Sequence, residues 1–357
     1  MIKGSVRTRV LIGLAAVAMV ASACSSTGAS SAPSGAATGK YVVGISNPGA
    51  VGNGWREAMI CSAKAQAVKS GNITSVLATT RVTDAAGQLA DIRDLIAKNV
   101  NILLINPSSP DALNPAIAEA VAKGIAVVSI DAPVTAPGAY NLSNDQVQYA
   151  YLGAKALFEQ MGKKGDVIYM RGIAGHQADT DRDTGFKKAL TEYPDIKVVK
   201  ETVTKWDQAI AVTQINDILT SGQKFDGIWT SGIDNVIVDA LKTAKHAFVP
   251  VVGADNAGFV KQLLNEAGLK GAAVTNPAAV GGAGVVLGLK LLANDKPADK
   301  NVHVTPELWD NTTAEGKAAL TAANDPTLPA IWPLGLTIKD WTTYPKEAVK
   351  ACKGPGE

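Results

Sequence analysis

Histidine and cysteine are scarce in this chain, and their scarcity excludes most metal-based and catalytic chemistry. The 357 residues include three of each. The histidines, His176, His246 and His303, show neither metal-ligand nor triad spacing. The Gly-x-Ser-x-Gly and His-Glu-x-x-His motifs of hydrolases are also missing. We therefore expect no cofactor and no metal, and the sequence argues against an enzyme.

An excess of charge of one sign is also missing. The chain has 34 Lys and Arg against 32 Asp and Glu. Three of the bases, Lys3, Arg7 and Arg9, stand in an N-terminal stretch without acids, so the remainder is close to neutral. Such a chain lacks the charge asymmetry that attracts nucleic acids or anionic membranes. We expect no nucleic-acid partner.

The first 23 residues have the pattern of a bacterial export signal. A basic start precedes an apolar run over residues 10–20, and small residues then lead to Cys24. The run is too short to span a membrane permanently. A cysteine at this place resembles a lipobox, with Ala21 where leucine is usual. We expect a lipid anchor on Cys24, which would hold the exported protein on the outer face of the cytoplasmic membrane; an ordinary cleaved signal with an incidental cysteine is the alternative.

A flexible tether separates this signal from the folded body. Residues 24–40 are nearly all Ser, Thr, Ala and Gly, a composition that cannot bury a core. The body begins near Tyr41 and is longer than one hydrophobic core usually serves, which predicts two lobes. The other two cysteines, Cys61 and Cys352, stand at opposite ends of this body. They are candidates for a disulfide in an oxidising compartment, and two separate buried thiols are the alternative.

Short apolar runs alternate with helical patterns along the body. Residues 41–45 precede a helix predicted over about 54–70, and residues 102–105 precede another over about 112–123. The runs are continuously apolar, which is typical of parallel strands covered on both faces. Strict alternation of strand and helix predicts a doubly wound, Rossmann-like α/β sheet.

A second series of the same kind begins after Tyr140. The sequence therefore predicts an N-terminal lobe of residues 41–142 and 277–302 and a C-terminal lobe of residues 143–276. Prolines interrupt the pattern in residues 303–357. We expect this part to form an irregular C-terminal extension that wraps the body.

Polar and aromatic residues follow the predicted strands, at the edge where a doubly wound sheet binds its ligand. Carboxylates and amides can hydrogen-bond hydroxyl groups, and indoles can cover the apolar face of a sugar ring. This set suits a neutral, polyhydroxylated ligand. The candidate binding residues are Asn47, Asn53, Trp55, Asn106, Asp131, His176, Asp179, Arg182, Trp206, Asp207, Asp255 and Asn276.

Single candidates also have structural explanations. Asp131 could form a turn, Asp207 could be a helix N-cap, and Arg182 could brace its neighbouring carboxylates. Trp55 and Trp206 favour ligand contact more strongly, because a large indole beside a polar strand end is poorly placed for the core.

Six segments resemble, in order and spacing, the ribose-binding-protein type of periplasmic sugar-binding proteins. The resemblance covers about residues 41–293. It implies a type I periplasmic binding fold whose two lobes are joined by a three-segment hinge. The segments are residues 43–48, 102–107, 127–131, 171–175, 205–209 and 251–255. By position, the resemblance implies ligand contacts for Asn47, Asn106, Asp131, Trp206, Asp255 and Asn276.

The chain departs from this family at residues that concern the ligand. Ala132 and Thr180 stand where the family has arginines, so different hydroxyl groups would lose their partners and ribose itself is not expected. Gly49 and Ala50 replace aromatic residues, and Trp55 could supply the missing stacking face.

The resemblance implies an extracytoplasmic solute-binding lipoprotein of an ABC importer. Such a protein binds a small neutral sugar or polyol, works as a monomer and passes the ligand to a permease with its ATPase. A surface-anchored glycosidase with two working carboxylates remains an alternative, as does a binding protein for a non-sugar signal such as a furanone autoinducer. A repressor of related fold would need a helix-turn-helix before Tyr41, for which the tether leaves no room.

Overall fold

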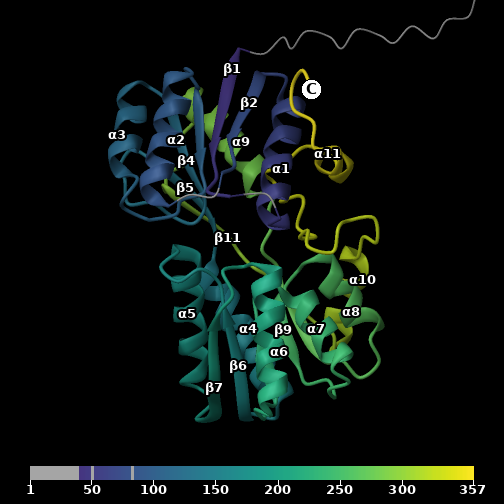
Figure 1. Cartoon of the computed structure of the whole chain (residues 1–357). Helices are drawn as coiled ribbons and strands as arrows, with labels where there is room; N and C mark the ends of the chain where they lie inside the picture. The colour runs from purple at the N-terminus through teal and green to yellow at the C-terminus, as the bar shows by residue number, and fades with distance from the viewer. Residues whose placement is uncertain (1–39, 50–51, 82–83) are drawn as a thin grey trace, which may run out of the picture. The chain divides into compact units, whose positions relative to one another are not determined.

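The computed structural model describes residues 40–49, 52–81 and 84–357, which form two lobes, each built on a six-stranded sheet (Figure 1). The predicted export signal, Cys24 and nearly all of the tether lie outside the described residues. Among the described helices, none combines the length and the apolar character that crossing a membrane requires.

The N-terminal lobe has the strand order β11-β5-β4-β3-β1-β2, and all of its strand pairs are parallel. Its strands are β1 (Tyr41–Ser46), β2 (Ile73–Thr79), β3 (Ile102–Ile105), β4 (Ala126–Asp131), β5 (Tyr140–Asn144) and β11 (Asn301–Val304). Helices α1 (Gly54–Ser70) and α9 (Val280–Leu292) cover one face, and α2 (Ala85–Ala97) and α3 (Asn114–Ala122) cover the other. Within β3, Ile102 and Leu104 enter the first core while Leu103 and Ile105 enter the second. A continuously apolar strand is needed because both faces are covered.

The C-terminal lobe repeats this plan with the order β12-β10-β9-β8-β6-β7. Its strands are β6 (Lys164–Arg171), β7 (Asp195–Val203), β8 (Gly227–Trp229), β9 (Val251–Ala254), β10 (Gly271–Val274) and β12 (Leu308–Asp310), of which only β12 is antiparallel to its neighbour. Helices α4 (Gln146–Gln160) and α5 (Gln177–Leu190) pack on one face. The other face carries α6 (Gln208–Ser221), α7 (Asp234–Thr243), α8 (Ala257–Asn265) and α10 (Ala314–Ala323). The predicted α/β fold with two parallel-sheet lobes is confirmed.

The chain passes between the lobes after β5, after β10 and after β11. The C-terminal segment passes between them once more, which the sequence does not predict. Leu320 of α10 packs in the core of the C-terminal lobe, whereas Leu336 and Tyr344 pack in the core of the N-terminal lobe. Residues 324–335 therefore form an additional crossing.

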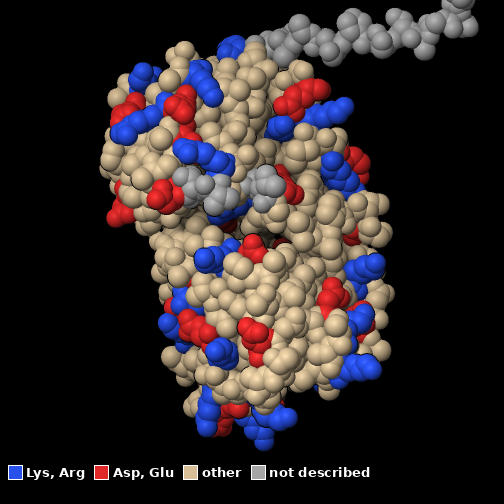
Figure 2. All heavy atoms as spheres, in the orientation of Figure 1, with Lys and Arg blue, Asp and Glu red and all other residues tan. Residues whose placement is uncertain are grey.

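Charged residues of both signs are interspersed over the face shown in Figure 2, without a large patch of either sign. This distribution agrees with the near-neutral balance of the sequence. The described residues on this face form no broad basic patch of the kind that binds nucleic acid.

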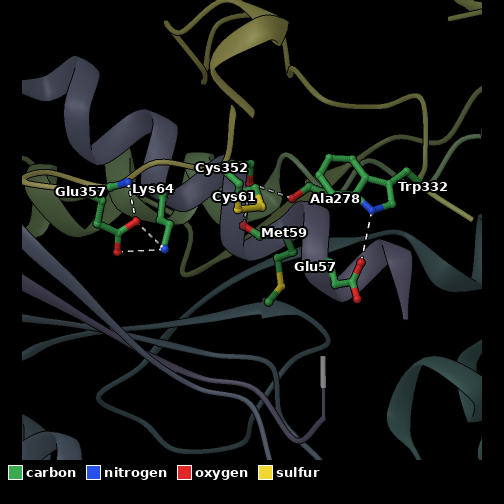
Figure 3. Close-up of a disulfide and its surroundings, with 10 residues drawn as sticks. Glu57, Met59, Cys61, Lys64, Ala278, Trp332, Cys352 and Glu357 are labelled. Carbon is green, nitrogen blue, oxygen red and sulfur yellow. Dashed lines mark hydrogen bonds and ion pairs between the residues drawn. A yellow bond between two sulfur atoms is a disulfide. The ribbon is translucent and has the colours of Figure 1, made fainter. Parts of the chain in front are cut away.

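The C-terminal segment is more regular than its prolines suggest. β11 extends the first sheet, β12 extends the second, and α10 and α11 (Lys346–Ala351) are helical. A disulfide joins Cys61 of α1 to Cys352 at the end of α11, with 4.5 Å between their Cα atoms (Figure 3). Beside it, Lys64 of α1 forms an ion pair of 2.7 Å with Glu357. The end of the chain is thus fixed to the first helix of the N-terminal lobe.

Candidate functional site

A pocket lies at the strand ends of both lobes, where residues from each lobe face a common space. Its volume is about 690 Å³ when the open solvent at its mouth is included. The pocket brings together these predicted binding residues: Asn53, Trp55, Asp131, Arg182, Trp206, Asp255 and Asn276.

Two predicted binding residues lie outside the pocket with their carboxylates already engaged. Asp207 is exposed and caps α6, where its Oδ1 accepts a hydrogen bond of 2.9 Å from the Ile210 N–H. Asp179 accepts from the Arg171 guanidinium at 2.6 Å and from the Gly172 N–H at 2.8 Å. These acids fix the backbone behind the site, because their oxygens bind the protein itself.

Three other predicted residues are buried next to the strand ends without lining the pocket. Asn47 and Asn106 follow β1 and β3 and are almost fully buried. His176 caps α5, with its Nδ1 accepting from the Ala178 N–H at 3.2 Å, and its ring meets Trp206 edge-on with centroids 5.1 Å apart. His176 therefore supports a wall of the pocket from behind.

Sequence reasoning missed several residues that shape the site. Arg56 lines the pocket and donates to the carbonyl oxygens of Pro48 and Gly49. Its position directly after Trp55, at the start of a predicted helix, was an available signal. Ile331 and Pro333 also line the pocket, from the C-terminal segment. No sequence pattern marked them, because this segment follows neither the strand nor the helix repeat.

Asp131 ends β4 in a left-handed backbone conformation, with φ of 72°. Residues other than glycine adopt this region at a cost, and such strain gathers at binding sites. Its Oδ1 accepts from the Gln146 side chain at 2.9 Å, and the Gln146 oxygen accepts from Arg182 Nε at 2.8 Å. Burial raises the pKa of Asp131, while the charges of Arg182 and Arg56 oppose that rise. The carboxylate is thus oriented by an amide and flanked by two cations.

Trp206 is held in the same unusual backbone region, with φ of 54°. Its Nε1 donates to the Ser231 hydroxyl at 3.3 Å. The indole lies directly against Gly172, where an added Cβ would stand 2.1 Å from the ring. The Arg182 guanidinium lies 5.6 Å from the indole centroid. A glycine contact and a hydrogen bond therefore fix the ring at the pocket.

Asp255 follows β9 and is fully buried. Its Oδ1 accepts from the Asn276 N–H at 3.0 Å, and its Oδ2 accepts from the Gly335 N–H at 3.1 Å. The carboxylate is thus held by backbone N–H groups from two other segments at the wall of the pocket. Burial raises the pKa of Asp255 to about 6, although these backbone N–H groups oppose the rise.

The charges that line the pocket balance. Two arginines, Arg56 and Arg182, and two acids, Asp131 and Asp255, line it, and the arginines lie close enough to Asp131 to oppose the rise of its pKa, so the site suits an uncharged ligand. Burial, together with the two arginines, lowers the pKa of His176 to about 3, which keeps its ring neutral at ordinary pH. Within the described ranges there is no group of His, Cys, Asp and Glu that could hold a metal ion.

The sequence model of the periplasmic binding protein domain matches residues 43–296, most of the chain. The chain belongs to this family. This match confirms the family that the six sequence segments indicate. Members of this family bind solutes for transporters, and the two-lobed fold and the pocket at the strand ends agree with membership.

Named relatives in the family are similar to this chain at a moderate level. The xylitol-binding protein of Mycolicibacterium smegmatis is 26% identical over 244 residues, covering 67% of this chain and 70% of that protein. The ribose import binding protein of Escherichia coli is 26% identical over 214 residues, covering 59% of this chain and 72% of that protein.

Solved structures extend the similarity to the fold. An ABC transporter solute-binding protein from Thermobispora bispora superposes with a TM-score of 0.71 at 28% identity, covering 89% of this chain and 98% of that one. A solute-binding protein from Mycobacterium smegmatis with bound glycerol gives a TM-score of 0.71 at 24% identity, covering 82% of this chain and 99% of that one. The second comparison supports the fold alone.

Proposed function

We propose that this protein is the solute-binding component of an ABC importer and binds one small neutral sugar or polyol between its lobes. The main support is the lining of the pocket, which combines carboxylates from both lobes with two arginines and two indoles, so that its charges balance. The two relatives are named for a polyol, xylitol, and a sugar, ribose.

The binding mechanism follows from the placement of the two carboxylates. Asp131 belongs to the N-terminal lobe and Asp255 to the C-terminal lobe, so a ligand held by both favours the conformation in which the lobes are close. A ligand shifts such an equilibrium only through its differential affinity for the two conformations. Hinge closure around the ligand is a common use of a two-lobed fold. Asp131 and Asp255 accept from hydroxyl groups, and Trp206 covers a C–H face.

Binding without catalysis fits these groups better than glycoside hydrolysis. A glycosidase needs one carboxylic acid that donates a proton and one carboxylate that acts as a base or nucleophile. Here the carboxylates of Asp131 and Asp255 each accept hydrogen bonds from N–H donors. Product formation from candidate glycosides would contradict this part of the proposal.

We also propose that Cys24 carries a lipid anchor that holds the mature protein on the outer face of the cytoplasmic membrane. The export-signal pattern before Cys24 supports it. Labelling of expressing cells with a fatty-acid analogue should mark the wild-type protein and not Cys24→Ser. A labelled Cys24→Ser variant would contradict the assignment. The monomeric state and the permease with its ATPase are further expectations for a protein of this role.

A thermal-shift screen of the protein from residue 25 onward tests the binding proposal. The panel contains xylitol, D-ribose, D-allose and glycerol. A ligand that binds only the folded protein raises the melting temperature by mass action, and the shift grows with ligand concentration. We expect at least one sugar or polyol to give such a concentration-dependent shift. A flat response to the sugars and polyols would contradict the proposal.

A further inference from the structure

The additional crossing places Ile331 and Pro333 at the pocket, and these residues belong to neither sheet. We propose that Ile331 and Pro333 form an apolar wall of the binding site and select ligands that present carbon atoms without hydroxyl groups at that wall. The inference rests on the proposed function, because it concerns the same pocket.

The C-terminal lobe holds this segment through backbone hydrogen bonds. The first two N–H groups of α8, from Ala257 and Gly258, donate to the carbonyl oxygens of Trp332 at 2.8 Å and Ala330 at 2.9 Å. The first N–H groups of a helix lack partners within the helix, so the segment satisfies donors that would otherwise need water. The Leu334 N–H donates to the Asp255 carbonyl oxygen at 2.9 Å. Three backbone hydrogen bonds therefore hold the segment on the C-terminal lobe.

The N-terminal lobe contacts the same residues from the other side. Trp332 Nε1 donates to Glu57 of α1 at 3.3 Å (Figure 3). At the start of α1, an added Cβ on Gly54 would stand 2.3 Å from the Ile331 carbonyl oxygen, which shows how closely the two backbones approach. Ile331 is thus fixed from both lobes at the pocket.

Neighbouring side chains of the segment serve different purposes. Trp332 packs against the core of the N-terminal lobe, and Leu334 is buried in the core of the C-terminal lobe. Ile331 is half-buried and lines the pocket, and among the described residues it belongs to none of the core clusters. Its side chain touches the start of α1 at Gly54, and the part that lines the pocket is available to a ligand.

The same segment also orients a polar group of the site. The Gly335 N–H donates to Asp255 Oδ2, so the apolar wall and one proposed acceptor are fixed by one stretch of chain. A ligand hydroxyl pressed against Ile331 would lose its water partners and gain none, which is unfavourable. The wall therefore suits the C–H face of a ring or a deoxygenated carbon.

Calorimetric titration of Ile331 variants tests this wall. The probe is whichever of xylitol, D-ribose, D-galactose and D-fucose binds the wild-type protein most tightly. We expect Ile331→Val to keep the affinity within about threefold and Ile331→Ala to lower it about tenfold, because apolar contact area is lost. Ile331→Asn should lower it at least as much, because its amide faces carbon atoms that cannot hydrogen-bond.

Leu328→Ala is the matched control, since Leu328 is a half-buried apolar residue of the same crossing that packs on both cores and does not line the pocket. Leu328→Ala should change the ligand affinity by less than about threefold. An equal loss for Leu328→Ala and Ile331→Ala would overturn the inference, because the crossing would then act only by holding the lobes. Unchanged or improved affinity of Ile331→Asn would overturn it as well, because the ligand would then present a hydroxyl there.

A wild-type protein that binds none of these four probes and neither D-allose nor glycerol contradicts both proposals. If the wild-type protein and Ile331→Ala bind one probe with equal affinity, only the inference about the apolar wall is contradicted. Melting temperatures of all variants without ligand show whether each remains folded.

Discussion

The pocket is built from two regions of the chain, the strand ends of the two lobes and the C-terminal segment. The strand ends supply hydrogen-bonding groups, of which Asp131 and Trp206 stand in a strained backbone conformation. The C-terminal segment supplies the apolar residues Ile331 and Pro333, held by backbone hydrogen bonds and, further along, by the disulfide at Cys352. The sheets therefore place the hydrogen-bonding side chains of the pocket, whereas the cross-linked C-terminal segment adds an apolar wall to it.

The largest expected effect concerns the anchoring of the C-terminal segment. The double variant Cys61→Ser, Cys352→Ser should have a free energy of unfolding about 3 kcal/mol lower than that of the oxidised wild type, because the disulfide closes a long loop in the unfolded chain. The two cysteines are separated by 291 residues. Urea unfolding of the oxidised wild type and the variant measures the difference. The reduced wild type is the control and should match the variant; a variant as stable as the oxidised protein would contradict the role of the bond.

The next effect concerns the strand-end acceptors. Asp131→Ala and Asp255→Ala should each weaken ligand binding by about 2 kcal/mol, or roughly 30-fold, because ligand hydroxyls lose their acceptors in a closed pocket. Calorimetry with the sugar or polyol that gives the largest thermal shift measures this. Asp207→Ala is the control: it removes an exposed helix cap outside the pocket and should leave the affinity unchanged. Equal affinities for all four proteins would refute the assignment.

A smaller effect is expected from pH. Burial raises the pKa of Asp255 to about 6, so the folded protein without ligand takes up a proton there as the pH falls through that value. A ligand hydroxyl that donates to the carboxylate competes with this proton. The affinity should therefore be highest at pH 7 and fall by up to about tenfold at pH 5. Titrations at both pH values measure it, and tighter binding at pH 5 would contradict an ionised acceptor.

The smallest effect concerns the glycine behind the stacking residue. Gly172→Ala should shift the Trp206 indole, because the new Cβ would stand 2.1 Å from the ring. We expect a loss of affinity of about threefold to fivefold. In a Trp206→Ala background the same change should add nothing, since the affected ring is gone. An equal effect in both backgrounds would show that Gly172 acts elsewhere.

The sequence is sufficient to predict the fold because the signal repeats. Short apolar runs alternate with helical patterns along both lobes, and helix α1 begins and ends as its pattern predicts, at Gly54 and Ser70. Strand ends gather at one edge of a parallel sheet, so Asp131, Trp206 and Asp255 could be assigned to a shared pocket without knowing any distance.

The remaining details of the site depend on which partner each side chain has. Asp179 and Asp207 have the same chemistry as Asp131, yet one binds Arg171 and the other caps α6. Sequence order does not distinguish these outcomes. Ile331 had no signal at all, because its position depends on how a non-periodic segment docks between two lobes. Long-range docking of this kind is the part that composition and periodicity leave undetermined.

A crystal structure with the tightest-binding sugar or polyol would show whether one ligand contacts both lobes. We expect one ligand in the pocket, with hydroxyl groups on Asp131 of one lobe and Asp255 of the other and a carbon face against Ile331. A ligand bound elsewhere, or held by one lobe only, would contradict it.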